Sequence, residues 1–486
     1  MINSKPRPCD ELAIRATRAD QRCTERRKQW VLAAAVLGST MSFLDESVVN
    51  IALPKIEADL ATTLPAMQWV VNAYTLCMSA LILSAGAAAD QLGRRRIFLL
   101  GVSVFAVSSL GCGLAPKVEL LILARVAQGI GAAMLIPCSL ALIGAAFDES
   151  ERGAAIGIWS GASAIAAGGG PLLGGWFVDH LSWRAIFLIN PLLAVPTLLI
   201  AARHVPESRD PAAKSELDWS GAMLAFAALT GIVYGLIAAS TDGWTDTMVI
   251  TALAAGTALF VVFVWHENHS PAPMLPPELF RSRNFTGVNL LTLLLYGALG
   301  GAFFFVPFQL IQAHGYSATA AGGVFLPFTV VLGTLSRSSG RLADRFGARW
   351  PLIIGPTLVA VGFLLLRWSS NQPDYWVFLI PMTVLGFGMT VTVAPLTTLV
   401  VNTVSQTQTG VASGINNAVA SVAGLLVISA LGTVALSIYH HALGRHLSPQ
   451  AASIEMFQAV MLIAAVLCFA SAAVAALMIR DDARAK

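Results

Sequence analysis

Three ionisable side chains stand inside apolar segments, where an unpaired charge is costly. Asp45 and Glu46 lie in the apolar segment 31–52, and Arg125 lies in the apolar segment 118–140. Ionisable groups at membrane depth commonly pair with one another or serve as proton relays. Because burial disfavours the charged form of a carboxylate, such a group can bind and release a proton near neutral pH. Arginine keeps its proton under ordinary conditions, so Arg125 is a fixed positive charge.

These three residues are predicted to couple proton movement to another process. For Asp45 the alternative is a purely structural pair with a neighbouring helix, and Arg125 is the candidate partner. Glu46 lies about 100° further round the helix, aligned with Asn50, so it either lines a cavity or lies near an interface. Gln128 follows Arg125 by three residues and shares its helix face. The sequence therefore predicts a water-filled cavity beside these side chains.

A second pattern, Gly-x-x-x-Asp-x-x-Gly-x-Arg, occurs twice, each time in a short basic loop between two apolar segments. Identical offsets indicate two related halves, and a membrane protein built from two halves places its binding site at their interface. The acid at a fixed offset favours a gating role, as a charged latch that closes one side. The alternative is a topology signal, which needs only Lys and Arg. The predicted gating residues are Gly86, Asp90, Gly93, Arg94 and Arg95 in the first copy and Gly340, Asp344, Arg345 and Gly347 in the second.

A third segment, 161–175, is rich in small residues. Glycines on successive turns let another helix approach closely, and a proline removes one backbone hydrogen bond and bends the helix. A glycine-rich phosphate loop would need a preceding strand, which the apolar pattern does not supply. The segment is predicted to be a kinked, tightly packed membrane helix whose critical residues are Gly170, Pro171, Gly174 and Gly175.

The composition excludes an ordinary soluble domain. The chain is 56% hydrophobic and only 12% charged, with a mean hydropathy of +0.71, whereas soluble domains carry about 25% charged residues. The net charge of +3 gives no support to nucleic-acid binding. The six cysteines show no metal-ligand spacing, and no disulfide and no metal site are expected.

Apolar windows of about 20 residues, the length that crosses a bilayer, recur along the chain. They predict an all-α polytopic membrane protein with two six-helix bundles and an inserted central pair. The predicted units are a basic tail 1–30, a first bundle 31–203, an inserted pair with its loops 204–284, a second bundle 285–478 and a tail 479–486. The fourteen predicted spans are 31–52, 68–88, 96–114, 118–140, 153–175, 184–203, 219–239, 247–266, 285–311, 319–336, 350–368, 374–399, 410–437 and 456–478.

The basic residues support the even count. With fourteen spans, 24 Lys and Arg fall in the loops, tails and span ends of the side that holds both termini and five on the other, and only Arg125 lies away from the ends of a span. Positive charge accumulates on the cytoplasmic side, so both termini are predicted to be cytoplasmic. The segment after Trp30 is too long for a signal peptide and is predicted to be the first span. The basic tail is predicted to orient the chain and contact anionic lipids; the alternative is a partner-binding role.

Four motifs in this order resemble those of the fourteen-helix drug:proton antiporters of the major facilitator superfamily. They are the segment-one pattern at 44–54, the loop at 86–95, the Arg125-x-x-Gln128-Gly129 pattern and the glycine-proline pattern at 170–175. The resemblance implies a major facilitator fold in a bacterial inner membrane, with amphipathic compounds exported from a central cavity in exchange for protons. It also implies that Asp45 is the coupling acid, that Arg125 is linked to the proton, and that Asp90 and Arg94 form a cytoplasmic latch.

The chain also departs from the family's pattern. Ala88 and Gln91 replace the usual Leu and Arg of the first loop, and Ala166 replaces a glycine of the antiporter segment. Spans nine to thirteen contain no acid at membrane depth, which favours neutral or weakly charged amphiphiles over dications. The predicted substrate cavity combines polar residues of both halves: Glu46, Asn50, Gln128, Asn289, Tyr296, Gln309, Asn416 and Asn417.

The sequence therefore predicts a proton-driven multidrug exporter that uses no cofactor. A dedicated exporter of one metabolite or antibiotic is the alternative, because apolar cavities discriminate weakly. No metalloprotease or serine-hydrolase motif is present, so the chain is not expected to be an enzyme. The transporter is expected to be monomeric, and an outer-envelope efflux partner is left open.

Overall fold

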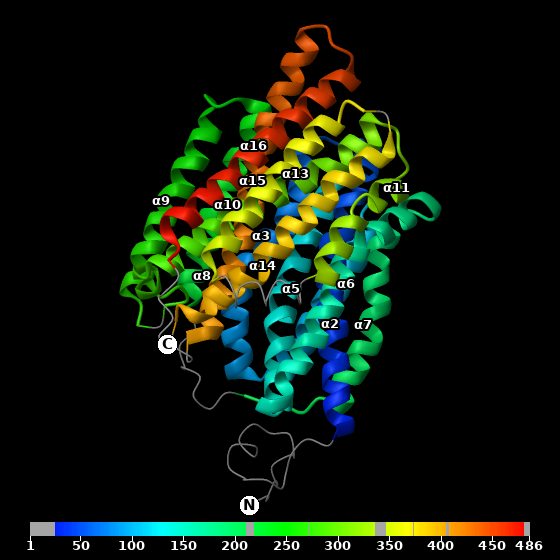
Figure 1. The fold of residues 1–486 in the computed structure, drawn as a ribbon. Coiled ribbons are helices and arrows are strands. Elements are labelled where there is room, and N and C mark those ends of the chain that lie inside the picture. The colour runs from blue at the N-terminus through cyan, green and yellow to red at the C-terminus, as the bar shows by residue number, and fades with distance from the viewer. Residues whose placement is uncertain are drawn as a thin grey trace, which may run out of the picture.

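The computed structural model describes residues 25–209, 218–271, 273–335, 347–372, 374–404 and 408–480. Within these ranges, fourteen helices are long and apolar enough to cross a membrane. They run roughly parallel to one another as a single bundle (Figure 1). The prediction of an all-α polytopic membrane protein with fourteen spans is confirmed.

The first half contains six helices. Small and apolar residues dominate them, so each can close its backbone hydrogen bonds internally while packing against a neighbour. Helix α2 packs against α6, α7 and α5, and α5 also packs against α3 and α4. Their bounds are α2 Glu25–Asp59, α3 Leu64–Leu92, α4 Arg94–Leu114, α5 Val118–Ala146, α6 Glu149–His180 and α7 Ala185–His204.

The inserted pair consists of α8 (Trp219–Asp242) and α9 (Thr247–His269). Asp218 caps α8 and Asp246 caps α9, each by accepting hydrogen bonds from backbone N–H groups of the first turn. Helix α8 packs against α9, against α3 of the first half and against α15 of the second half. The pair is therefore in contact with both bundles.

The second half repeats the six-helix plan with more interruptions. Helix α10 ends in a π-helical turn, η2, and the span Ala318–Leu335 begins with α11. The bounds are η1 Pro277–Arg281, α10 Arg283–Phe308, η2 Gln309–Ala313, α11 Ala318–Gly323, α13 Arg349–Ser369, η3 Tyr375–Phe378, α14 Leu379–Asn402, α15 Thr409–Gly444 and α16 Pro449–Met478.

Several helices extend beyond the predicted spans. Helix α2 begins at Glu25, inside the predicted tail, and α15 and α16 continue well past 437 and before 456. The hairpin of α15 and α16 projects beyond the rest of the bundle (Figure 1). Hydropathy windows stop at the first polar residues, whereas backbone hydrogen bonds continue the helix into water. The predicted spans therefore mark the apolar parts of longer helices.

Candidate functional site

Asp45, Arg125 and Gln128 meet in the interior of the first half. Their side chains are 0–1% exposed. The Arg125 Nη1 group donates to Asp45 Oδ2 and, at 2.8 Å, to Gln128 Oε1. Gln128 Nε2 in turn donates to Asp45 Oδ1 at 2.7 Å. The predicted juxtaposition of the acid with the arginine is present, and it joins α2 to α5 with a buried ion pair.

Two further polar residues complete this network. Asn190 of α7 donates to Asp45 Oδ1 at 3.1 Å and to Ser109 Oγ of α4 at 2.9 Å. Both side chains are fully buried. Sequence reasoning assigned neither residue to the site, because a lone Asn or Ser in an apolar helix carries no spacing signal. Their polarity inside a span is the only hint that the sequence offers.

The guanidinium of Arg125 has further partners. Its Nε donates to the backbone carbonyl of Val70 at 3.0 Å, and its Cζ lies 4.2 Å from the centre of the Tyr74 ring. Cation–π contact of this kind stabilises a desolvated cation. Arg125 is therefore held by α2, by α3 and by its own helix at once, so its charge has a fixed position.

Glu46 has a different environment from its neighbour Asp45. Its side chain is exposed, although it stands near the middle of α2. On the same helix face, Ser42 is buried and Asn50 is half-buried, so this face is not a lipid-exposed stripe. Glu46 is thus an exposed carboxylate between two less exposed polar residues, and its place in the substrate cavity stays a prediction.

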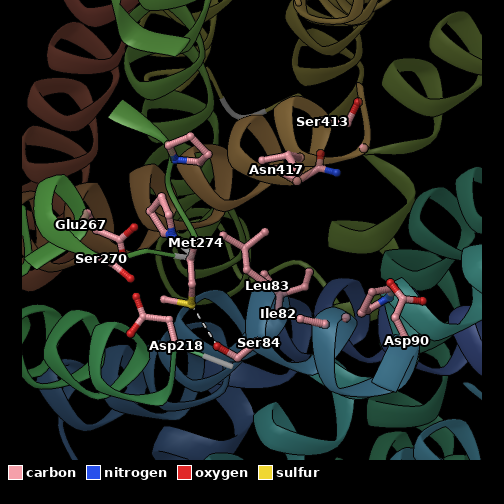
Figure 2. Close-up of a pocket in the computed structure, with 18 of the residues that line it drawn as sticks. Ile82, Leu83, Ser84, Asp90, Asp218, Glu267, Ser270, Met274, Ser413 and Asn417 are labelled. Carbon is pink, nitrogen blue, oxygen red and sulfur yellow. Dashed lines mark hydrogen bonds between the residues drawn. The ribbon is translucent and has the colours of Figure 1, made fainter. Parts of the chain in front are cut away.

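A large cavity opens at the end of the bundle where α2 begins and α16 ends, here called the terminal face. Its volume is about 1200 Å³. Figure 2 shows Ser84 and Asp90 of α3 on one side and Ser413 and Asn417 of α15 on the other. Residues of α5, the end of the inserted pair and the loop that follows it also line the cavity. The cavity therefore lies between the two halves.

The antiporter segment packs against the second half at the other end of the bundle, here called the opposite face. A Cβ added to Gly175 would lie 2.2 Å from the carbonyl oxygen of Ala318, and one added to Gly322 would lie 2.1 Å from that of Pro171. Gly170 also lies close to Ser47 of α2, and Gly174 lies less closely against Val48, with an added Cβ 3.0 Å from the Val48 carbonyl oxygen. Small residues were predicted to permit close helix contact, and the structure shows both contacts.

A carboxylate reinforces this closure. Asp179, at the end of α6, accepts hydrogen bonds from the backbone N–H groups of Ala318 (3.0 Å) and Thr319 (2.7 Å) and from Thr319 Oγ1 (2.6 Å). It thereby caps α11, a helix of the other half. Sequence reasoning missed Asp179. The opposite face is closed by contacts between the halves, whereas the terminal face is open.

The sequence model of the Major Facilitator Superfamily matches residues 35–428, with a second match over residues 338–486. The chain belongs to the Major Facilitator Superfamily. Curated relatives support this membership. "Multidrug resistance protein Stp" of Mycobacterium tuberculosis is 36% identical over 410 residues, which cover 84% of this chain and 76% of the relative. The "Tetracenomycin C resistance and export protein" of Streptomyces glaucescens is 32% identical over 413 residues, covering 85% and 77%.

Solved structures of other family members share the fold. The bacterial homolog of the human lysosomal transporter Spinster, in an inward-facing and unoccupied conformation, aligns with a TM-score of 0.67 at 17% identity, covering 94% of this chain and 98% of that one. The xylose transporter XylE from E. coli, inward open, aligns with a TM-score of 0.63 at 15% identity, covering 94% and 97%. At these identities the similarity concerns the fold alone.

The structure of this facilitator does not bring all eight predicted cavity residues together. Asn417 lines the terminal cavity. Asn416 is buried and donates to Asn289 Oδ1 at 3.1 Å, so this pair joins α15 to α10 and does not face the cavity. Gln309 is buried beside His314 near the opposite face, and Tyr296 is half-buried. Buried amide side chains need hydrogen-bond partners, and the sequence alone could not distinguish an amide that joins two helices from one that faces the cavity.

The first loop motif of the facilitator is bonded to the end of α7 and to the segment that follows it, as well as within itself. Asp90 and Arg94 form an ion pair with a 2.8 Å contact. Glu207, which was not predicted, accepts from the backbone N–H of Arg95 at 3.1 Å and so caps the start of α4. Of the second copy, Gly340, Asp344 and Arg345 lie outside the described residues. Gly347 has a φ of 78°, and no latch across the second half can be described.

Gly93 provides a stability prediction for this loop. Its φ is 120°, and an added Cβ would lie 2.6 Å from Glu207 Oε1. We expect Gly93→Ala to lower the thermal stability of the purified protein by about 1–2 kcal/mol, because alanine is strained at positive φ and displaces the cap. Gly243→Ala is the matched control: its φ is 86° and nothing lies within 4 Å of its Cβ position. If both variants lose the same thermal stability, backbone strain alone explains the loss and contact with Glu207 contributes nothing to it.

Proposed function

We propose that this transporter exports small amphipathic compounds in exchange for protons by alternating access. The observation that carries the proposal is a carboxylate, Glu46, whose side chain is exposed near the middle of α2, next to the buried ion pair of Asp45 and Arg125. An exposed acid at membrane depth can exchange protons with water, whereas a charge with no function there is disfavoured. The names of the relatives, which refer to multidrug resistance and to antibiotic resistance and export, support drug efflux.

In this proposal the terminal face is cytoplasmic and the membrane is the inner membrane of a bacterium. The excess of Lys and Arg on the side of both termini supports this orientation. The described state is then open to the cytoplasm and closed to the outside. Substrate enters the cavity between α3 and α15 from the cytoplasm. Its exit requires the contacts of α6 with α11 to separate and the terminal cavity to close.

The polar residues have different roles in this proposal. Glu46 takes up and releases the coupling proton, and the ion pair of Asp45 and Arg125 supplies fixed charges beside it. Asp45 accepts from Arg125, Gln128 and Asn190, so it can be protonated only when this network opens. The proton-motive force replaces any cofactor, and no chemical reaction on the substrate is needed, so we propose that the protein is not an enzyme. The cavity lies within one chain, which supports a monomer as the working unit.

A dedicated exporter of one compound is the second candidate. The specific support is that two relatives are named for single antibiotics, tetracenomycin C and methylenomycin A. A multidrug exporter and a dedicated exporter would both use the same cavity and the same proton site. Transport assays with a panel of amphiphiles distinguish them, since a multidrug exporter responds to several unrelated compounds and a dedicated one to a single chemical class.

Proton flux in liposomes tests the coupling. The purified protein is reconstituted with an internal pH dye, a pH gradient is imposed, and amphipathic compounds are added. We expect substrate-dependent proton flux in the wild type and a loss of at least tenfold in Glu46→Gln. Glu119→Gln, an exposed acid in the first turn of α5, is the control and should transport normally. Normal coupled flux in Glu46→Gln would exclude Glu46 as the proton carrier.

A further inference from the structure

A second pair of acids lies outside the proton site proposed above, where the inserted helices end at the terminal face. Asp218 precedes α8 and Glu267 lies in the last turn of α9. Both line the cavity (Figure 2), yet both side chains are almost fully buried, at 4% and 2% exposure. Buried acids need partners.

Each of these acids uses one oxygen for structure. Asp218 Oδ1 accepts from the backbone N–H of Gly221 at 2.8 Å and from Ser220 Oγ at 2.9 Å, and it lies 2.9 Å from His266 Nε2. Glu267 Oε2 accepts from the backbone N–H of Leu275 at 2.8 Å. The first carboxylate thus fixes the start of α8, and the second fixes the loop that leads into the second half.

The remaining oxygen of each acid has no hydrogen-bond partner among the described residues. These atoms, Asp218 Oδ2 and Glu267 Oε1, are also shut off from solvent. They converge on one small space. A Cβ added to Gly221 would lie 2.7 Å from Glu267 Oε1 and 2.8 Å from Asp218 Oδ2. Two ionised carboxylates facing each other in such a space would repel strongly, whereas one shared proton removes the repulsion and satisfies both oxygens.

We propose that Asp218 and Glu267 share one proton and form a second protonation site, carried by the inserted helix pair at the mouth of the cavity. The proton resides on Glu267 Oε1 and is donated to Asp218 Oδ2. Loss of the proton leaves two like charges in a sealed space. The start of α8 and the loop after α9 then separate, water enters, and this part of the cavity wall loosens.

The surroundings favour Asp218 as the ionised member. Burial alone would raise its pKa, but hydrogen bonds from Gly221, His266 and Ser220 outweigh burial and lower the pKa below its ordinary value. Glu267 is bonded by backbone N–H groups and by no side-chain donor in the described part of the chain, with Leu275 donating at 2.8 Å, so the proposal assigns the proton to Glu267. The other described titratable groups in the cavity wall are Asp90 on α3 and Glu278 and Arg281 on η1, and Glu278 is exposed.

Hydrogen–deuterium exchange of the full-length protein in detergent tests the site without any transport assay. Exchange of the segment 273–280, corrected for the intrinsic effect of pH, is measured from pH 5 to pH 9. We expect strong protection at low pH and a rise of roughly tenfold or more as the shared proton is lost. Glu267→Gln keeps an oxygen for Leu275 N–H and carries no charge, so its segment should stay protected at every pH.

Three further variants sharpen the test. Asp218→Asn retains the helix cap, since Asn caps as well as Asp, and should also abolish the pH step. Glu278→Gln, an exposed acid of the same wall, should leave it unchanged. Gly221→Ala forces the two carboxyls apart and should remove protection at low pH.

Infrared spectra should show that Glu267→Gln loses one protonated-carboxyl band. A pH step that persists in both Glu267→Gln and Asp218→Asn, or an unchanged band, would overturn the proposal and leave the antiport proposal untouched.

Discussion

Replacing Asp45 with Asn is expected to destroy the folded protein rather than only its coupling. The substitution leaves the Arg125 guanidinium, 1% exposed, without its counter-charge inside the bundle. Breaking a buried ion pair by removing one partner costs about 3–5 kcal/mol, because the remaining charge is uncompensated. We therefore expect a large fall in the yield of monodisperse protein and in its thermal stability. Fluorescence-detected size-exclusion chromatography and thermal unfolding in detergent measure both.

A double variant separates a structural role from a coupling role. In Asp45→Asn with Arg125→Gln both charges are absent, and amide groups can keep hydrogen bonds with Gln128 and Asn190. Folding should largely recover, with a coupling free energy of up to about 3 kcal/mol between the two sites, while proton flux stays absent. If Asp45→Asn alone is as stable as the wild type and loses only proton coupling, the ion pair is not a structural anchor and Asp45 itself carries the proton.

Placing a methyl group on Gly175 is expected to open the opposite face. The added Cβ would lie 2.2 Å from the carbonyl oxygen of Ala318 and 2.5 Å from its carbonyl carbon. Backbone atoms cannot rotate away, so α6 and α11 must separate. Overpacking of this kind costs about 1–3 kcal/mol, and each 1.4 kcal/mol shifts a population about tenfold. Gly175→Ala should therefore favour the state in which the opposite face is open and the terminal cavity is closed.

Distance measurements check this shift. Spin labels at Leu181, just after α6, and at Trp376, within η3, report the separation of the halves at the opposite face. These side chains are 64% and 73% exposed. Longer distances are expected in Gly175→Ala. Gly169→Ala is the matched control, because it changes the same helix at a position with nothing within 4 Å. Identical distance distributions in the wild type and Gly175→Ala would show that this contact does not control closure.

The sequence by itself determined the membrane class, the number of spans and the two-half construction. Hydropathy and the positions of Lys and Arg report directly on transfer into a bilayer, which is a local property of each segment. The pairing of Asp45 with Arg125 could also be predicted from the sequence, because a fixed charge inside an apolar helix needs a counter-charge. The roles of these residues in coupling remain predictions.

Tertiary structure alone decided which polar groups meet. Asn190 donates to Asp45, and Asp179 accepts from the start of α11. Both contacts join residues far apart in the chain, and no spacing in the sequence predicts them. The same holds for Asn416, whose amide is used by Asn289 and not by the cavity. Likewise, the space between Asp218 and Glu267 exists only because α8 and α9 pack closely at Gly221. Hydrogen-bond partners depend on angles and distances between helices, which packing fixes and one-dimensional patterns do not contain.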